Sequence, residues 1–298
     1  MGHEPAGLRA IGAVKDITEL GEQRSDPWRP DYFLQPQETE RATVNGKWFG
    51  IGSCWVAPHI YYNTDLLAEA GVDPPSSDPA QAWTWDQFLE TGRLLTLDPR
   101  DATQATKGFD INNVRQWEAG RPTSSRFQQR FIRTAATPGT DYTSGWGMPE
   151  SVAAIQQVAD LQLVHQIAPV PAAFEQMGMD AWTALATGNV AIIIDGSWAL
   201  QDISKLDFAF GCGVLPVLAE PATVMLAHCH VISADTDQPE ASWSLLQYLS
   251  SNEYQLGLCQ AGLWLPSHTS LLSEEGQAEW LTPDVHRKDT DRLRLTMC

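Results

Sequence analysis

The spacing of apolar and polar residues predicts a chain in which short strands and helices alternate. Residues 190–194 are continuously apolar and β-branched, which indicates a buried strand. Three other segments have extended character: residues 53–62, 208–215 and 223–233. Apolar residues recur at helical spacing after Pro149 and on one face of residues 239–250. A second helix is expected at 253–260, and residues 13–22 form a weak helical stretch. Because strands and helices interleave throughout, the sequence predicts the α/β class.

Turn and capping residues mark where several of these elements begin or end. The pair Asn45-Gly46 favours the two-residue turn of a β-hairpin. Thr84 and Gln87 have the spacing of a capping box, in which each side chain bonds the other residue's main chain, so a helix should begin there. Glycine is expected to end two helices and to form a tight turn after the buried strand, at Gly71, Gly188 and Asp195-Gly196.

Length and charge limit the classes of partner. A chain of 298 residues with 43% hydrophobic residues can bury a large core, and its length predicts two lobes. It has 19 basic and 37 acidic residues, a formal net charge of −18. Such a surface repels nucleic acid and anionic lipid, so neither is expected as a partner. No apolar run reaches the length of about 18 residues that a membrane-spanning helix needs, so no membrane insertion is predicted.

The five cysteines are odd in number, widely spaced and without a CxxC pair. This pattern indicates scattered buried thiols rather than a disulfide framework or a structural zinc site, and it leaves a single disulfide open. His228 and His230 flank Cys229 on one face of an expected strand, which could supply two ligands of a metal site. No matching pair lies near in sequence, so polar histidines lining a cleft or the core are the simpler interpretation, and no metal is predicted.

Catalytic and cofactor motifs are missing from the sequence. It has no GxSxG, HExxH, GxGxxG or phosphate-binding loop, so we expect no cofactor and no enzyme activity. A carboxylate pair for glycoside hydrolysis stays open because it requires proximity in space. The formal candidates are Asp98, Asp101, Asp110 and Asp195. The twelve tryptophans point toward carbohydrate, because indole faces stack on the C–H faces of sugars, although about half of them should fill the core.

Residues 1–10 show no basic start, apolar stretch or small-residue cleavage site. No secretion signal is therefore expected within this chain.

Several segments in a fixed order then resemble one family. They are residues 45–51 (NGKWFGI), 60–67 (IYYNTDLL), 70–74 (AGVDP), 84–88 (TWDQF), 181–191 (AWTALATGNVA), 195–198 (DGSW), 213–216 (GVLP), 231–234 (VISA), 240–243 (EASW) and 262–266 (GLWLP). Together they resemble the sugar-type extracellular solute-binding proteins of ABC importers, the relatives of maltose-binding protein.

The resemblance implies a two-lobe periplasmic-binding-protein-like fold with the ligand in a cleft between the lobes. Residues 1–56 plus 228–298 would form the first lobe, and residues 57–227 the second. Relatives carry further segments before residue 13 and after residue 266. The resemblance therefore also implies that the first lobe is incomplete, with part of its sheet missing and strand edges and apolar faces exposed.

The implied function is binding of a mono- or oligosaccharide, with closure of the lobes, for delivery to the permease subunits of an ABC transporter. The protein would be a monomer that acts outside the cytoplasm. Relatives of this kind also take up polyols and phosphorylated glycerol compounds. Two other readings remain: a carbohydrate-active glycoside hydrolase, and a truncated remnant that binds nothing.

Eight residues are the expected ligand contacts. Trp198 matches the tryptophan of the family's G-x-W motif, which commonly stacks on a sugar ring. Ser53 and Trp55 immediately precede the first crossing between lobes, and His228 lies near the second. The remaining candidates are Ser197, Trp117, Trp146 and Trp264. Tyr62 and Trp243 are expected in the core.

Overall fold

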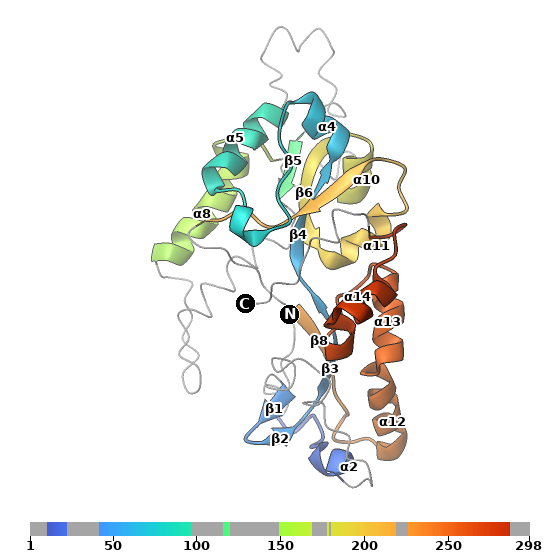
Figure 1. Ribbon diagram of the computed structural model, residues 1–298. Helices are drawn as coiled ribbons and strands as arrows, with labels where there is room; N and C mark the ends of the chain where they lie inside the picture. The colour runs from blue at the N-terminus through green and yellow to red at the C-terminus, as the bar shows by residue number, and fades with distance from the viewer. Residues whose placement is uncertain are drawn as a thin grey trace. The chain divides into compact units, whose positions relative to one another are not determined.

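The computed structural model describes residues 11–22, 42–96, 116–119, 149–168, 178, 180–218 and 226–286. The chain forms two compact units, each with its own strands and helices (Figure 1). Unit 1 consists of Met1–Val56 and Met225–Val285, and unit 2 of Ala57–Val224 and His286–Cys298. The chain thus passes between the units at 56–57, at 224–225 and at 285–286.

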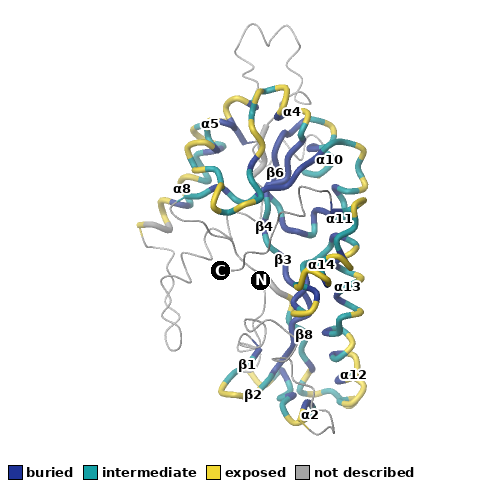
Figure 2. The backbone as a smooth tube through the Cα atoms, in the orientation of Figure 1, coloured by how far each residue is buried: buried dark blue, intermediate teal, exposed yellow. Residues whose placement is uncertain are grey.

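Unit 2 is built on a mixed four-stranded sheet. In spatial order its strands are β5 (Gln116–Ala119), β6 (Val190–Gly196), β4 (Pro58–Asn63) and β7 (Phe210–Gly213). β5 runs parallel to β6, whereas β4 is antiparallel to both of its neighbours. β6 is buried almost throughout, as its β-branched sequence predicts, and Figure 2 shows it dark along its length.

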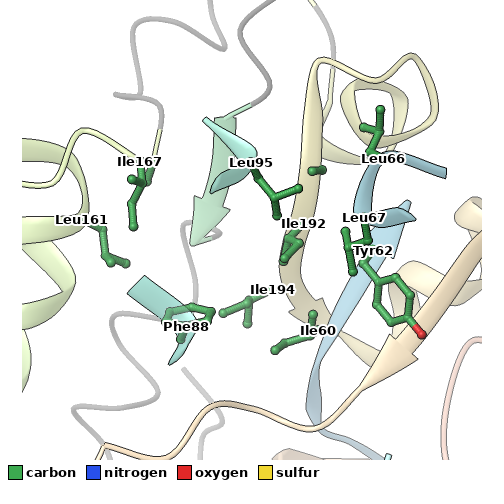
Figure 3. Close-up of a cluster of buried hydrophobic side chains, with 12 residues drawn as sticks. Ile60, Tyr62, Leu66, Leu67, Phe88, Leu95, Leu161, Ile167, Ile192 and Ile194 are labelled. Atoms are coloured by element: carbon green, nitrogen blue, oxygen red, sulfur yellow. The ribbon is translucent and has the colours of Figure 1, made fainter. Parts of the chain in front are cut away.

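One face of this sheet carries the main core of unit 2 (Figure 3). Ile60 and Tyr62 of β4 lie beside Ile194 and Ile192 of β6, because successive strand residues point to opposite faces. Three helices bring apolar side chains to the same cluster: α4 (Thr64–Glu69) with Leu66 and Leu67, α5 (Trp85–Leu95) with Phe88 and Leu95, and α8 (Pro149–Leu163) with Leu161. The prediction that Tyr62 is a core residue is confirmed.

The opposite face of the same sheet is more polar. His59 and Tyr61 of β4 lie opposite Asp195 and Ile193 of β6 in the strand register. Helix α10 (Ala181–Ala186) packs against β6 and β4, and α11 (Leu200–Ile203) follows close to α10. The titratable side chains of His59, Tyr61 and Asp195 therefore lie on this face, near the last residue of β6.

Unit 1 is centred on the antiparallel pair β3 (Ile51–Val56) and β8 (Leu226–His230). Further main-chain pairings extend it: Trp55 bridges Leu265, and Val14 bridges Ser233. The α-helices in the described part of unit 1 are α2 (Thr18–Glu22), α12 (Pro239–Leu249), α13 (Asn252–Gln260) and α14 (Glu274–Trp280). Two apolar clusters pack among them, one around Trp243, as predicted, and one around Trp280.

The helix expected at 13–22 is only partly correct. Residues 13–15 are extended, because Lys15 N donates to the carbonyl of Ile232 and Ala234 N donates to that of Ala13. The helix is limited to Thr18–Glu22. Pairing with a segment more than 200 positions away overrides the weak local helical pattern, which no periodicity argument could anticipate.

The predicted hairpin, capping box and helix-ending glycines are confirmed. The hairpin of β1 (Thr43–Val44) and β2 (Lys47–Trp48) turns at Asn45 and Gly46, both with positive φ. The capping box of Thr84 and Gln87 is present at the start of α5. Gly71 and Gly188 take positive φ directly after the ends of α4 (Thr64–Glu69) and α10. The tight turn expected at Asp195-Gly196 is wrong, since β6 continues through Gly196 and a short 3-10 helix, η4 (Ser197–Ala199), follows.

Besides η4, four short helical segments were not expected from the sequence: η2 (Pro79–Gln81), α11, η5 (Thr269–Leu272) and α14. Within the described ranges no helix is both long and apolar enough to cross a bilayer.

Candidate functional site

The first candidate cluster lies where β6 ends in unit 2. Trp198, in η4, is half-buried, and its six-membered ring folds back over the α-carbon of Gly196. A Cβ at position 196 would overlap this ring. Gly196 has φ −72°, which any residue can adopt, so the contact with the indole rather than the backbone conformation requires glycine there. The Gly196-Ser197-Trp198 sequence thus encodes one particular placement of the tryptophan.

Side chains and main chain hold this strand end in place. The Asp195 carboxylate accepts from Gly196 N at 2.7 Å and from the Trp182 indole Nε1 at 3.2 Å. The Tyr61 hydroxyl donates to the Gly196 carbonyl at 3.3 Å, and Ser197 N donates to the carbonyl of Ala57 at 2.8 Å. Hydrogen bonds to charged acceptors are the stronger kind, so the Asp195 contacts carry most of this anchoring.

Burial shifts the pKa values of His59 and Tyr61, two residues of β4 near this strand end. It lowers the pKa of His59 to about 4. It also raises the pKa of Tyr61, with added effects from Cys212 and Asp195. The His59 and Tyr61 rings meet edge to face at 6.3 Å. At neutral pH His59 is therefore neutral opposite the Asp195 carboxylate, and the face holds a fixed arrangement of polar groups.

Ser197 lies beside Trp198 but points inward. Its side chain is only 6% exposed, and its hydroxyl is buried without a hydrogen-bond partner in the part of the chain that the structure describes. Its role as a ligand contact stays a prediction.

The second candidate cluster lies on β3 and β8 of unit 1. The strand pairing is irregular between Gly52 and Cys54, so Ser53 has no register partner on β8. Ser53 is fully buried, and its hydroxyl lies 2.7 Å from Nε2 of His230. His228, two residues earlier on β8, is exposed and meets the Trp264 ring edge to face at 4.7 Å. The fold therefore brings Ser53 to His230 and His228 to Trp264.

Trp55 occupies the end of β3 and is 3% exposed. Its main chain exchanges two hydrogen bonds of 2.8 Å with Leu265, the residue after Trp264. Its indole Nε1 is buried and has no acceptor among the described residues. A buried donor without an acceptor is uncommon and costs about 1–3 kcal/mol, so Trp55 is the second orphaned polar group among the candidates, after Ser197.

Metal and thiol chemistry have little support in these clusters. Burial and the neighbouring His228 lower the pKa of His230. Within the described ranges no three His, Cys, Asp or Glu side chains gather as a metal site would require. Among the described residues, Cys54, Cys212, Cys229 and Cys259 form no disulfide, and burial raises the pKa of Cys212 and of Cys259.

The other candidates are placed only in part. Trp117 belongs to β5, next to β6 in the sheet. Trp146 lies outside the described residues, as do three of the formal hydrolase candidates: Asp98, Asp101 and Asp110. Asp195, the fourth, is engaged with Trp182 and Gly196 as described above.

A family model for bacterial extracellular solute-binding proteins matches residues 4–284. The chain belongs to this family. It is 26% identical over 162 residues to an arabinooligosaccharide-binding protein of Halalkalibacterium halodurans, a match that covers 52% of this chain and 31% of that protein. The chain thus aligns with less than a third of that relative's length.

Solved structures of solute-binding proteins share the fold. An ABC substrate-binding protein from Listeria monocytogenes in complex with cycloalternan has a TM-score of 0.76 and 22% identity, covering 97% of this chain and 70% of that one. A solute-binding protein from Thermotoga lettingae bound with α-D-tagatose has a TM-score of 0.69 and 18% identity, covering 93% and 67%. The predicted two-lobe α/β fold is therefore confirmed. Members of the family are binding proteins rather than enzymes.

The sequence analysis named His228 and Trp198 as expected ligand contacts but assigned no positioning role to the residues around them. Asp195 and Trp182 act on the strand end, and His230 is the partner of Ser53. The alternation His228-Cys229-His230 was a usable signal, since it places two imidazoles on one side of a strand. Nothing in the sequence indicates that Ser53, 177 positions earlier, lies beside His230.

Proposed function

We propose that the chain binds a mono- or oligosaccharide for delivery to the permease of an ABC transporter, outside the cytoplasm and as a monomer. The observation that carries this proposal is the placement of Trp198. Its indole is held against Gly196 at the anchored end of β6 and is half-buried, which suits stacking on the apolar face of a sugar ring. The family, and relatives whose names mention arabinooligosaccharide, cycloalternan and tagatose, support a carbohydrate ligand.

Unit 1 carries a candidate sugar-binding cluster of its own, formed by His228, His230 and Trp264. Imidazole nitrogens donate to or accept from hydroxyl groups, and Trp264 adds an aromatic surface beside His228. Binding on this proposal makes and breaks no covalent bond. The strong acidity of the chain says nothing of the ligand's charge, because the binding residues form a small part of the surface.

The test is thermal unfolding of the full chain with arabinotriose, maltotriose, cycloalternan, D-tagatose and glycerophosphocholine. A ligand that binds only the native state adds about 2.7 kcal/mol at a hundredfold excess over its Kd, which shifts the midpoint upward. We expect one carbohydrate to produce such a shift, and Trp198→Ala to abolish it.

Trp85→Ala is the matched control, since Trp85 is also half-buried in unit 2 but packs on Phe88 in α5. This variant should lower the midpoint and still respond to the sugar. If only glycerophosphocholine shifts a cooperative transition, the ligand is a phosphorylated solute and not a sugar. Release of new reducing ends from an oligosaccharide would favour a glycoside hydrolase instead. A transition that no compound shifts would contradict the proposal.

A further inference from the structure

A hydrogen bond joins the side chains of Ser53 on β3 and His230 on β8. Ser53 is fully buried, and its hydroxyl has two contacts: Nε2 of His230 at 2.7 Å and Sγ of Cys54 at 3.9 Å. A buried hydroxyl needs an acceptor for its proton, and sulfur at 3.9 Å is a poor one. The Ser53 hydroxyl therefore donates to Nε2 of His230.

This direction of donation fixes the histidine tautomer. A neutral imidazole has one N–H, and an Nε2 that accepts leaves the proton on Nδ1. Nδ1 of His230 has no hydrogen-bond partner among the described residues, and it is not one of the fully buried polar atoms that lack one. The side chain as a whole is half-buried. His230 therefore presents a single oriented N–H donor.

The surroundings of His230 suit a hydroxylated ligand. His228 precedes it by two residues on β8, so both rings lie on the same side of the strand. His228 is exposed and pairs with the Trp264 ring. A fixed donor next to an aromatic pair matches a sugar, which offers acceptor oxygens and apolar C–H groups side by side.

We propose that His230 is a specificity-determining residue whose Nδ1–H donates to a hydroxyl or ring oxygen of the ligand, and that Ser53 is the positioning residue that fixes this tautomer. The inference rests on the proposed carbohydrate function and assigns one of its contacts. It also gives Ser53 a different role from the direct ligand contact that its sequence position suggested.

The tautomer is measured without any ligand, by NMR of the full chain labelled with ¹⁵N-histidine at neutral pH. The His230 signals are assigned by their absence in His230→Gln. In the native chain we expect Nδ1 of His230 to be protonated and Nε2 to be unprotonated. In Ser53→Ala we expect the spectrum to shift toward a mixture of the two neutral tautomers. Ser267→Ala is the control, because Ser267 is another fully buried serine of unit 1 whose hydroxyl contacts no histidine. A native chain with the proton on Nε2 would overturn the proposal.

Binding is then compared in His230→Asn and His230→Gln by calorimetry with whichever sugar of the panel binds the native chain. An asparagine amide can replace Nδ1–H, whereas a glutamine amide reaches the position of Nε2. One neutral hydrogen bond corresponds to roughly a threefold to tenfold change in affinity. We expect His230→Gln to lose this threefold to tenfold in affinity and His230→Asn to retain most of the affinity. Thermal unfolding should show a cooperative transition for both variants. Equal affinity of both variants and the native chain would overturn the ligand role.

The two measurements separate this inference from the proposed function. If no sugar binds the native chain, the carbohydrate function fails and the ligand role of His230 fails with it. The tautomer spectrum would still decide whether Ser53 donates to His230.

Discussion

The indole of Trp198 lies over the α-carbon of Gly196, two residues earlier in the chain. This contact connects a strand end to an aromatic side chain. It explains why glycine precedes tryptophan by two positions, although the backbone at 196 has no unusual conformation.

Replacing Gly196 by alanine should displace the Trp198 ring, because the added methyl group occupies its position. Overpacking of this kind costs about 1–3 kcal/mol. We expect Gly196→Ala to lower the free energy of unfolding by that amount in urea titrations and to abolish the sugar-induced stabilisation.

Gly257→Ala is the matched control for that substitution. Gly257 lies within α13, and no atom would come within 4 Å of its added Cβ. Because alanine is the better helix former, the control should gain about 0.5–1 kcal/mol. Similar losses in both variants would contradict the steric explanation.

Asp195→Asn should loosen the strand end that presents Trp198. Gly196 N donates to one carboxylate oxygen and Trp182 Nε1 to the other, so the NH2 group that replaces one oxygen removes one of the two hydrogen bonds, and the charge is lost as well. Hydrogen bonds to charged groups contribute about 1.5–3 kcal/mol, so a loss in this range is expected in denaturant titration. Trp182→Phe removes only one donor and should cost less. A larger loss in Trp182→Phe than in Asp195→Asn would place the stabilisation in indole packing instead.

His59 should make the protein less stable in acid. Its folded pKa of about 4 lies below the ordinary value of 6.5, so the unfolded chain binds more protons between these pH values. The contribution is fully present above pH 6.5, falls as the pH drops toward 4, and amounts to at most about 3 kcal/mol. His230 and His268, whose pKa values are also lowered, act in the same direction.

The measurement is the free energy of unfolding from pH 7 to pH 4 in the native chain and in His59→Phe, which keeps a ring beside Tyr61. The variant should show a shallower decline. An unchanged slope would mean that His59 is protonated in the folded protein at a pH close to its ordinary value.

The capping box at the start of α5 should be measurable by itself. Thr84 Oγ1 accepts from Gln87 N at 3.2 Å, and the Gln87 side chain accepts from Thr84 N at 2.9 Å. Thr84→Ala should cost about 0.5–2 kcal/mol, whereas Thr84→Ser retains a hydroxyl and should cost little. If serine were as damaging as alanine, the methyl group of Thr84 rather than its hydroxyl would be the stabilising part.

Local structure was predictable because its causes are local. The hairpin at Asn45-Gly46 and the cap at Thr84 depend on residues within three positions of each other. The strand at 190–194 was predictable because its β-branched residues are buried on both faces of the sheet. The helix expected at 13–22 failed at its start, where pairing with 232–234 supplies main-chain hydrogen bonds that the sequence pattern does not reveal.

In the candidate sites, too, contacts between neighbours in the chain were easier to predict than contacts between distant residues. Trp198 could be named as a candidate from sequence because Gly196, which its ring contacts, is its neighbour in the chain. The contact of Ser53 could not be predicted, since its partner is a histidine 177 positions away, brought near by the pairing of β3 with β8. Asp195 was only one of 37 acidic residues until the structure placed Trp182 beside it.

The sequence by itself determined the α/β class, the turns and caps and the order of family segments, because these depend on side-chain periodicity and on backbone preferences of adjacent residues. Tertiary structure alone decided the strand order β5-β6-β4-β7, the pairing of residues 13–15 with the segment after β8, and the hydrogen bond that orients His230. These features depend on contacts between distant segments, whose formation requires the chain to close long loops, and no local preference specifies which segments will meet.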